Sequence, residues 1–168
     1  MKRIASLLVI SVVLFAACSS GGGDSAELMS KARGLEEDEQ TAEALLVYEQ
    51  LVRYHPQASE APEALFRSAA LYYKDQHDIL KAATTYELVC EKYPQSEFAH
   101  QGLFFAAFTY ANELGNLEHA RVAYEKYLRD YPDSSMAPTA TFELENLGKS
   151  PEELLQSLQN SASPPDEN

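Results

Sequence analysis

Small, aromatic and helix-ending residues recur along the chain in a pattern that repeats every 38 residues. Each unit has an alanine, a tyrosine four residues later, a proline eight residues after that, and a phenylalanine ten residues further on. A fixed period of this size predicts a solenoid, in which each unit buries its apolar face only against its neighbours. The recurring residues are Ala44, Ala82 and Ala120; Tyr48, Tyr86 and Tyr124; Pro56, Pro94 and Pro132; and Phe66, Phe104 and Phe142.

The spacing within a unit predicts packed helices. Ala44 and Tyr48 fall on one helical face, so the alanine permits a close approach and the ring fills the space beside it. Pro56 cannot continue a helix and marks the turn. We therefore interpret the recurring tyrosines and phenylalanines as core residues. The pattern predicts helices near 25–37, 41–54, 60–75, 79–92, 97–113, 118–130 and 135–147, and a weaker one near 151–159.

The series of alanine, aromatic and closing proline resembles the second helix of the tetratricopeptide repeat (TPR). The likeness covers roughly residues 26–158. It implies an all-α fold, a right-handed α-solenoid of about three TPR helix pairs followed by a C-terminal capping helix. The usual TPR period is about 34 residues, and the additional residues here fall between each proline and the next phenylalanine.

The first residues have the pattern of a signal peptide. Lys2 and Arg3 precede an apolar run, 4–17, that is short for a membrane span. The run ends in Ala16-Ala17-Cys18, which resembles a bacterial lipobox, whose cysteine is lipidated. The alternatives are an ordinary signal peptide with an incidental cysteine and an uncleaved membrane anchor.

The lipobox resemblance divides the chain into four parts. We expect a lipoprotein signal peptide at 1–17, a lipid-anchored Gly/Ser tether at 18–25, a TPR domain at 26–160 and a disordered tail at 161–168. Residue 19 is serine rather than aspartate. This resembles lipoproteins that are sent to the outer membrane, which implies a periplasm-facing protein anchored in the membrane by its acyl chains.

Charge and motif content exclude several function classes. The chain has 26 acidic and 13 basic residues, so we expect no nucleic-acid partner, which would need a basic surface. No phosphate-binding, zinc-binding or nucleophile motif is present, and we predict no enzymatic activity and no cofactor. The four histidines are far apart in sequence, so we predict no metal site. Cys90 is interpreted as a buried thiol, with an intermolecular disulfide as the alternative.

The TPR resemblance also implies a groove lined by the first helix of each pair. Phe105 is informative because its neighbour Phe104 keeps the core register, so Phe105 points into the groove or toward the next helix. Arg33, Arg67 and Lys74 would form a basic strip there, unless they are ordinary solvated side chains. The groove positions are Met29, Arg33, Arg67, Leu71, Lys74, Phe105, Thr109 and Asn112.

These features lead to a functional hypothesis. The chain is similar to the TPR lipoprotein of the β-barrel assembly machinery and to the Tol-Pal-associated coordinator. This implies an adaptor that binds protein partners in a cell-envelope complex, such as outer-membrane protein assembly. The alternatives are a Tol-Pal or division protein, a pilus-secretin accessory protein, and a lipoprotein that captures a small ligand or glycan.

Overall fold

The computed structural model describes residues 23–74 and 77–162, with side chains described as far as Gln156. Within these ranges the chain forms eight helices and no strand, as the sequence predicts. The predicted signal peptide, Cys18 and the tether as far as residue 22 lie outside the described residues, as do residues 163–168. The helices are α1 (Ser25–Glu37), α2 (Thr41–Tyr54), α3 (Ala61–Lys74), α4 (Ile79–Lys92), α5 (Glu97–Asn112), α6 (Leu117–Asp130), α7 (Ala137–Glu145) and α8 (Pro151–Ala162).

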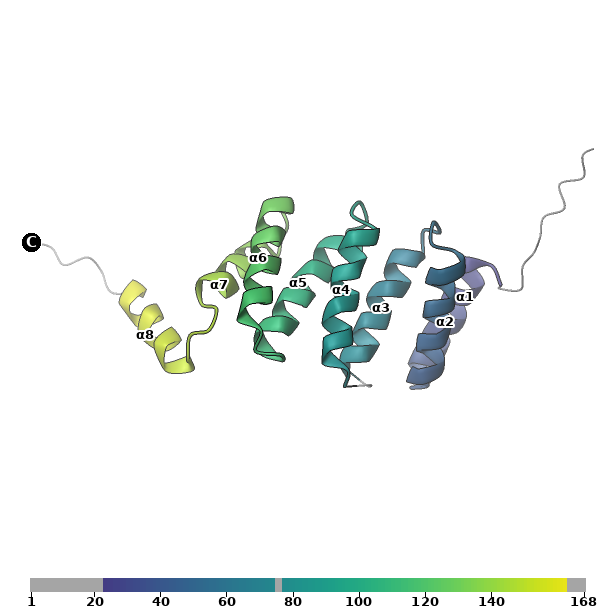
Figure 1. The fold of residues 1–168 in the computed structure, drawn as a ribbon, viewed down its shortest axis with the longest axis horizontal. Helices are drawn as coiled ribbons and strands as arrows, with labels where there is room; N and C mark the ends of the chain where they lie inside the picture. Colours follow the sequence, from purple (N-terminus) through teal and green to yellow (C-terminus); the bar gives the residue numbers. More distant parts are fainter. Residues whose placement is uncertain (1–22, 75–76, 163–168) are drawn as a thin grey trace, which may run out of the picture.

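The helices stand side by side in a row and form two layers (Figure 1). One layer contains α1, α3, α5 and α7, and the other contains α2, α4 and α6. From α1 to α7 each helix packs against the next, and α3 also contacts α5. The last helix, α8, makes no extensive contact with the others and continues two residues into the segment predicted as a tail.

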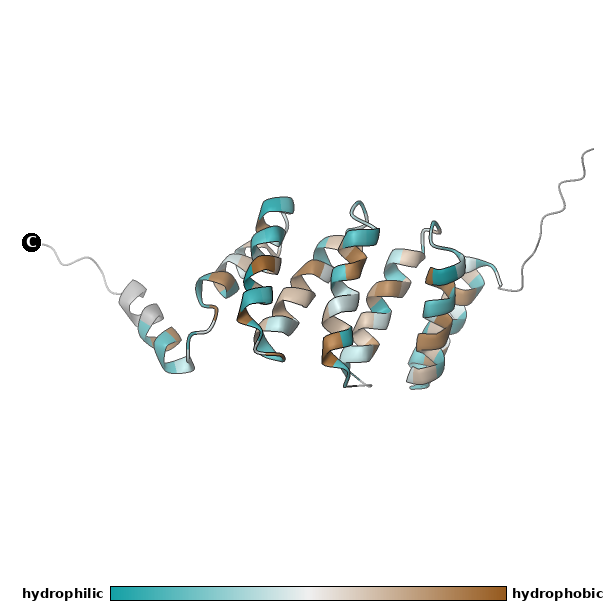
Figure 2. Cartoon of the chain, viewed as in Figure 1, coloured by the Kyte–Doolittle hydropathy of each residue, from teal (hydrophilic) through white to brown (hydrophobic). Residues whose placement is uncertain are grey.

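The core follows the repeat, as predicted. The alanines of the period are fully buried, and the tyrosines four residues later are between 0% and 6% exposed. Figure 2 shows hydrophobic residues distributed along α1 to α7 rather than gathered at one end. This distribution is expected for a core that continues from one repeat to the next.

The phenylalanines of the period differ from one another. Phe104 is buried and packs edge-on against Tyr124 and Tyr127 of α6, at 5.9 and 5.8 Å between ring centres. Phe66 is half-buried, whereas Phe142 is 41% exposed. The prediction that Phe142 is a core residue is therefore wrong. Its ring lacks a covering helix because α8, the next helix in the chain, stands apart from α7 (Figure 1).

Two hydrogen bonds of the same kind join successive repeats. The Tyr72 hydroxyl on α3 donates to Glu49 on α2, and the Tyr110 hydroxyl on α5 donates to Glu87 on α4 at 3.0 Å. Both partners are shifted by one period between the two junctions. Lys81 adds a cation–π contact, with its ammonium 4.0 Å from the centre of the Tyr72 ring. We call the two hydrogen bonds, Tyr72–Glu49 and Tyr110–Glu87, the tyrosine–glutamate pairs.

Glycine replaces the tyrosine at both ends of the series. The positions one period before Tyr72 and one period after Tyr110 are Gly34 and Gly148. At the first position, the described residues before α1 include no helix that could supply an acceptor. At the second, Glu125 of α6 stands in the register of Glu49 and Glu87 and is exposed. The tyrosine–glutamate pairs thus join α2 to α3 and α4 to α5, and no equivalent pair joins α6 to α7 in the described residues.

Candidate partner-binding groove

The predicted groove residues all lie on the odd-numbered helices, but they do not all reach the surface. Four of the eight side chains are exposed, one is half-buried and three are buried. The exposed ones are Arg33, Lys74, Phe105 and Asn112; Arg67 is half-buried; Met29, Leu71 and Thr109 are buried.

Met29, Leu71 and Thr109 are buried and offer little side-chain surface, although Met29 and Thr109 each line a hollow described below. Met29 and Leu71 pack in the core formed by the first three helices, and both are less than 5% exposed. The Thr109 hydroxyl donates to the backbone carbonyl of Phe105 at 2.7 Å. An odd-numbered helix packs against neighbours on two sides, so only a narrow stripe of each helix faces outward. Partner contact remains a prediction for all eight residues.

The two arginines of the predicted basic strip are paired with two glutamates. Glu63 binds Arg33 at 2.6 Å and Arg67 at 2.7 Å. Arg67 also lies 3.2 Å from Glu36, whose carboxylate accepts a 2.6 Å hydrogen bond from the buried Tyr48 hydroxyl. Burial, together with this hydrogen bond, raises the pKa of Tyr48 above its ordinary value. The α1–α3 junction is therefore closed by an ion-pair network that leaves little net positive charge for an acidic partner.

Acidification is expected to weaken this junction by protonating Glu63. Burial alone would raise the pKa of its carboxyl, but the hydrogen bonds from Arg33 and Arg67 outweigh it and hold the pKa below the ordinary 4.5. Such a group stabilises the fold above its unfolded pKa and loses that effect as pH falls through the folded value.

Thermal melts test this expectation. Glu63→Gln should melt below wild type near neutral pH, and the two curves should converge below about pH 4. Glu91→Gln, at an exposed position on α4, is the control that should follow wild type throughout. Equal melting of Glu63→Gln and wild type at neutral pH would contradict the stabilising role of the network.

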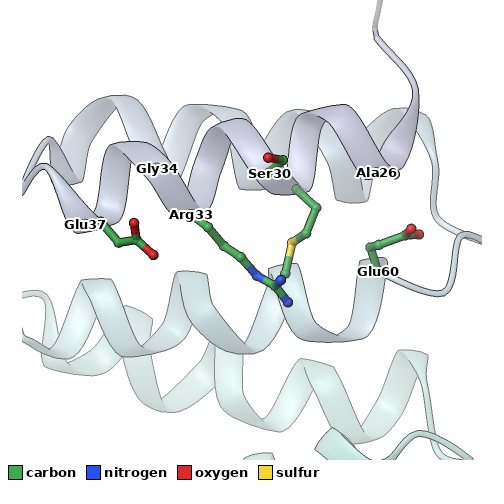
Figure 3. A pocket seen from close by; sticks show the side chains of 7 residues that line it. Ala26, Ser30, Arg33, Gly34, Glu37 and Glu60 are labelled. Carbon is green, nitrogen blue, oxygen red and sulfur yellow. The ribbon is translucent and has the colours of Figure 1, made fainter.

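A shallow, open hollow of about 500 Å³ lies along α1. In Figure 3 the Arg33 side chain extends from α1 toward the neighbouring helix, between Glu37 and Glu60. Gly34 lines the hollow and leaves room in it, because a Cβ atom at this position would meet nothing within 4 Å. The lining is partly polar, and Arg33 is already paired with Glu63, so this hollow does not indicate a particular ligand.

A second hollow, between α3 and α5, is smaller and mainly apolar. It has a volume of about 160 Å³ and is lined by Tyr73, Tyr86, Phe105, Phe108 and Thr109. We call it the aromatic hollow. The ring of Phe105 stacks on that of Tyr86 at 5.6 Å, and Phe105 remains 38% exposed. Burial raises the pKa of Tyr86 to about 12, so its hydroxyl is neutral at physiological pH.

One carboxylate borders the aromatic hollow. The Tyr73 hydroxyl donates to Glu113 at 2.7 Å, just beyond the end of α5. This hydrogen bond raises the pKa of Tyr73, so that residue is also neutral. The hollow therefore combines aromatic walls with a negative charge at its edge.

The remaining chemistry-bearing residues of the described chain form no further site. Cys90 is 4% exposed, with its Sγ 3.5 Å from the Tyr131 hydroxyl and 3.8 Å from the Lys126 ammonium. This burial supports the interpretation as a core thiol rather than an intermolecular disulfide. No group of three His, Cys, Asp or Glu side chains among the described residues is arranged to hold a metal ion. None of the described helices has the length and hydropathy needed to cross a bilayer.

Comparisons with known proteins agree with this architecture. Residues 63–96 and 103–134 match the tetratricopeptide repeat family model. The Sgt2 TPR domain from Aspergillus fumigatus has a similar structure, with a TM-score of 0.54 and 22% sequence identity over 88% of this chain and 89% of that chain. The fold is a TPR solenoid. The matched TPR segments correspond to the pairs α3–α4 and α5–α6. A comparison with curated proteins gives no match.

Several residues near the groove were not predicted from the sequence. Glu36 and Glu63 neutralise the arginines, and Tyr73, Phe108 and Glu113 form part of the aromatic hollow or its edge. The sequence does contain a signal for the aromatic hollow. Arg67 and Ala70 of one unit correspond to Phe105 and Phe108 of the next, and a comparison of the units would have identified this change.

Proposed function

We propose that this TPR chain is an adaptor that binds protein partners along α1, α3 and α5. TPR domains in general bind proteins, and this fold contains such helix pairs. The observation that carries the proposal is Phe105, an aromatic side chain that stays 38% exposed on a helix whose neighbouring Phe104 is in the core. Exposed aromatic side chains beside a pocket are the kind of anchor that dominates interface energies.

The proposal includes a lipid anchor on Cys18. Its support is the sequence: a basic start at Lys2 and Arg3, an apolar run and a small-residue pair before the cysteine. Serine at position 19 supports an outer-membrane destination facing the periplasm. In that setting the adaptor would serve a cell-envelope complex, with outer-membrane protein assembly as the first candidate and the Tol-Pal, division and pilus-secretin systems as the others.

A ligand-capturing lipoprotein is the weaker alternative. The aromatic hollow, at about 160 Å³, is smaller than the roughly 300–1,000 Å³ of a typical small-molecule site. The chain has no tryptophan to stack against a sugar ring. Both observations favour contact with a polypeptide.

Replacement of Cys18 is expected to abolish membrane attachment. Wild type should sediment with membranes and incorporate a palmitate analogue, whereas Cys18→Ser should be unlabelled and either unprocessed or soluble, because the thiol is the acceptor of the lipid. Cys90→Ser is the matched control, since Cys90 lies inside the TPR core, and it should still be labelled. Recovery of wild type in the soluble fraction would contradict the anchor.

The adaptor role is tested by capture from solubilised envelopes. Tagged wild type, cross-linked before solubilisation, should recover a specific protein whose contact sites map to α1, α3 or α5. Cross-links confined to α2, α4 and α6 would place the binding surface on the opposite layer and overturn the proposed groove.

A further inference from the structure

The three junctions between successive odd-numbered helices differ in chemistry, and one position of the repeat register shows the difference clearly. This position is Arg67 on α3, Phe105 on α5 and Glu143 on α7, each one period from the next. The residue at this position lies on the outward side of each junction and contributes to its chemistry together with the residues around it. A comparison of the three identifies where a partner side chain has room to bind.

The first junction is already filled. Arg67 binds Glu36 and Glu63, Glu36 accepts the Tyr48 hydroxyl, and Tyr48 is 0% exposed. A partner side chain entering here would have to displace ion pairs and hydrogen bonds that are satisfied within the chain. Partly buried charges that lose their partners are costly, so this junction disfavours an inserted anchor.

The second junction is open and apolar. Phe105 replaces the arginine, and Phe108 stands where the preceding unit has Ala70. Tyr73 and Tyr86 complete the walls, and the enclosed space of about 160 Å³ has the size of one side chain rather than of a separate ligand. Neutral aromatic rings give this space no group that would hold a charge.

One carboxylate, Glu113, borders this junction, and the charged side chains of α5 and α7 are all acidic apart from His100. Neither of these helices contains a lysine or an arginine. Glu113 borders the hollow through Tyr73, and Glu143 occupies the register position at the third junction. Lys149, just after α7, is engaged by Asn146 at 2.9 Å. Lys74 is an exposed cation on the α3 side, so charge complementarity favours a basic partner residue on the α5 side, where Glu113 lies.

We infer that the aromatic hollow receives one apolar side chain, of leucine to phenylalanine size, from an extended basic segment of a partner protein. A lysine or arginine beside that anchor meets Glu113. The inference rests on the proposed adaptor function and names the chemistry of its partner. An acidic partner is disfavoured, because the arginines of the predicted basic strip are already paired with glutamates.

Three defined peptides test the inference. Each has about twelve residues of Gly and Ser around a central motif: Leu between two Lys, Ala between two Lys, or Leu between two Glu. Fluorescence anisotropy with the full chain should give the tightest binding for the Leu–Lys peptide. Removal of the leucine side chain or reversal of the charges should each raise Kd about tenfold, since a central apolar anchor and charge complementarity both contribute to binding.

Variants of the protein locate the site. Phe105→Ala should raise Kd for the Leu–Lys peptide about tenfold, and Glu113→Gln should raise it less and flatten its salt dependence. Phe142→Ala is the matched control, because this phenylalanine is similarly exposed, at 41%, but lies outside the hollow. Lys74→Ser, at the end of α3, should leave binding unchanged or tighter. Circular dichroism should show equal helicity in all variants.

The outcomes separate this inference from the adaptor proposal. Unchanged Leu–Lys affinity in Phe105→Ala, or tighter binding of the Glu peptide, overturns the inference. If cross-linking still places a partner on α1, α3 or α5, the adaptor proposal stands without it. If a folded protein binds neither the peptides nor any envelope protein, both fail.

Discussion

Tyr124→Ala is expected to lower the free energy of unfolding by about 3–5 kcal/mol, as for other large-to-small changes at fully buried aromatic positions. The ring is 0% exposed and packs edge-on against Phe104 at 5.9 Å. Its loss would leave a cavity between α5 and α6 that the neighbouring helices cannot fill without breaking the repeat. Chemical denaturation followed by circular dichroism measures the change.

Two controls separate burial from chemistry at Tyr124. Tyr124→Phe should be close to neutral, because the buried hydroxyl has no hydrogen-bond partner among the described residues. Tyr54→Ala, at a tyrosine that is 60% exposed, should change stability by no more than about 0.5 kcal/mol. If Tyr124→Ala unfolds at the same denaturant concentration as wild type, the repeat register is wrong.

Gly102→Val is expected to destabilise the contact between α4 and α5 by about 3 kcal/mol, at or above the upper end of ordinary overpacking. A Cβ atom at this glycine would lie 2.6 Å from the backbone carbonyl oxygen of Tyr86 and 3.1 Å from the Cβ of Val89. The oxygen belongs to a helix backbone and cannot rotate away, so the two helices must separate.

Gly34→Ala is the opposite case and serves as the control. A Cβ at Gly34 would meet nothing within 4 Å, and the residue lies inside α1. Alanine should therefore stabilise the helix by about 0.5–1 kcal/mol. Opposite changes in melting temperature are the expected result, and destabilisation by both substitutions would indicate that the spacing of the helices is not as described.

The repeat period made the fold predictable. α1, α2 and α4 begin and end at the predicted residues, and α3, α5, α6 and α7 differ from prediction by at most two residues at either end. Each prediction depended on local residues, such as an alanine at a helix contact and a proline at a turn. Phe142 was misjudged because its burial depends on α8 rather than on its own unit, and a periodic pattern assigns an end unit the environment of an interior one.

The groove was less predictable because its chemistry depends on contacts between units. The pairing of Arg67 with Glu36 joins residues 31 positions apart on two helices, and no spacing within one helix indicates it. The orientation of Phe105 followed from its neighbour Phe104 and is correct in that the ring is exposed. The predicted groove residues did not include Tyr73 and Tyr86, which line the aromatic hollow together with Phe105.

The tyrosine–glutamate pairs bear on how such a chain can change its length. A unit such as residues 61–98 contains both Tyr72 and Glu87, so an in-frame duplicate would bring with it the donor for the junction before it and the acceptor for the junction after it. Internal duplication and deletion of whole units are thus compatible with the existing contacts. The glycine-bearing ends are different, because Gly34 and Gly148 cannot supply the hydroxyl. Evolution or engineering can therefore alter the number of interior repeats while the two ends are kept.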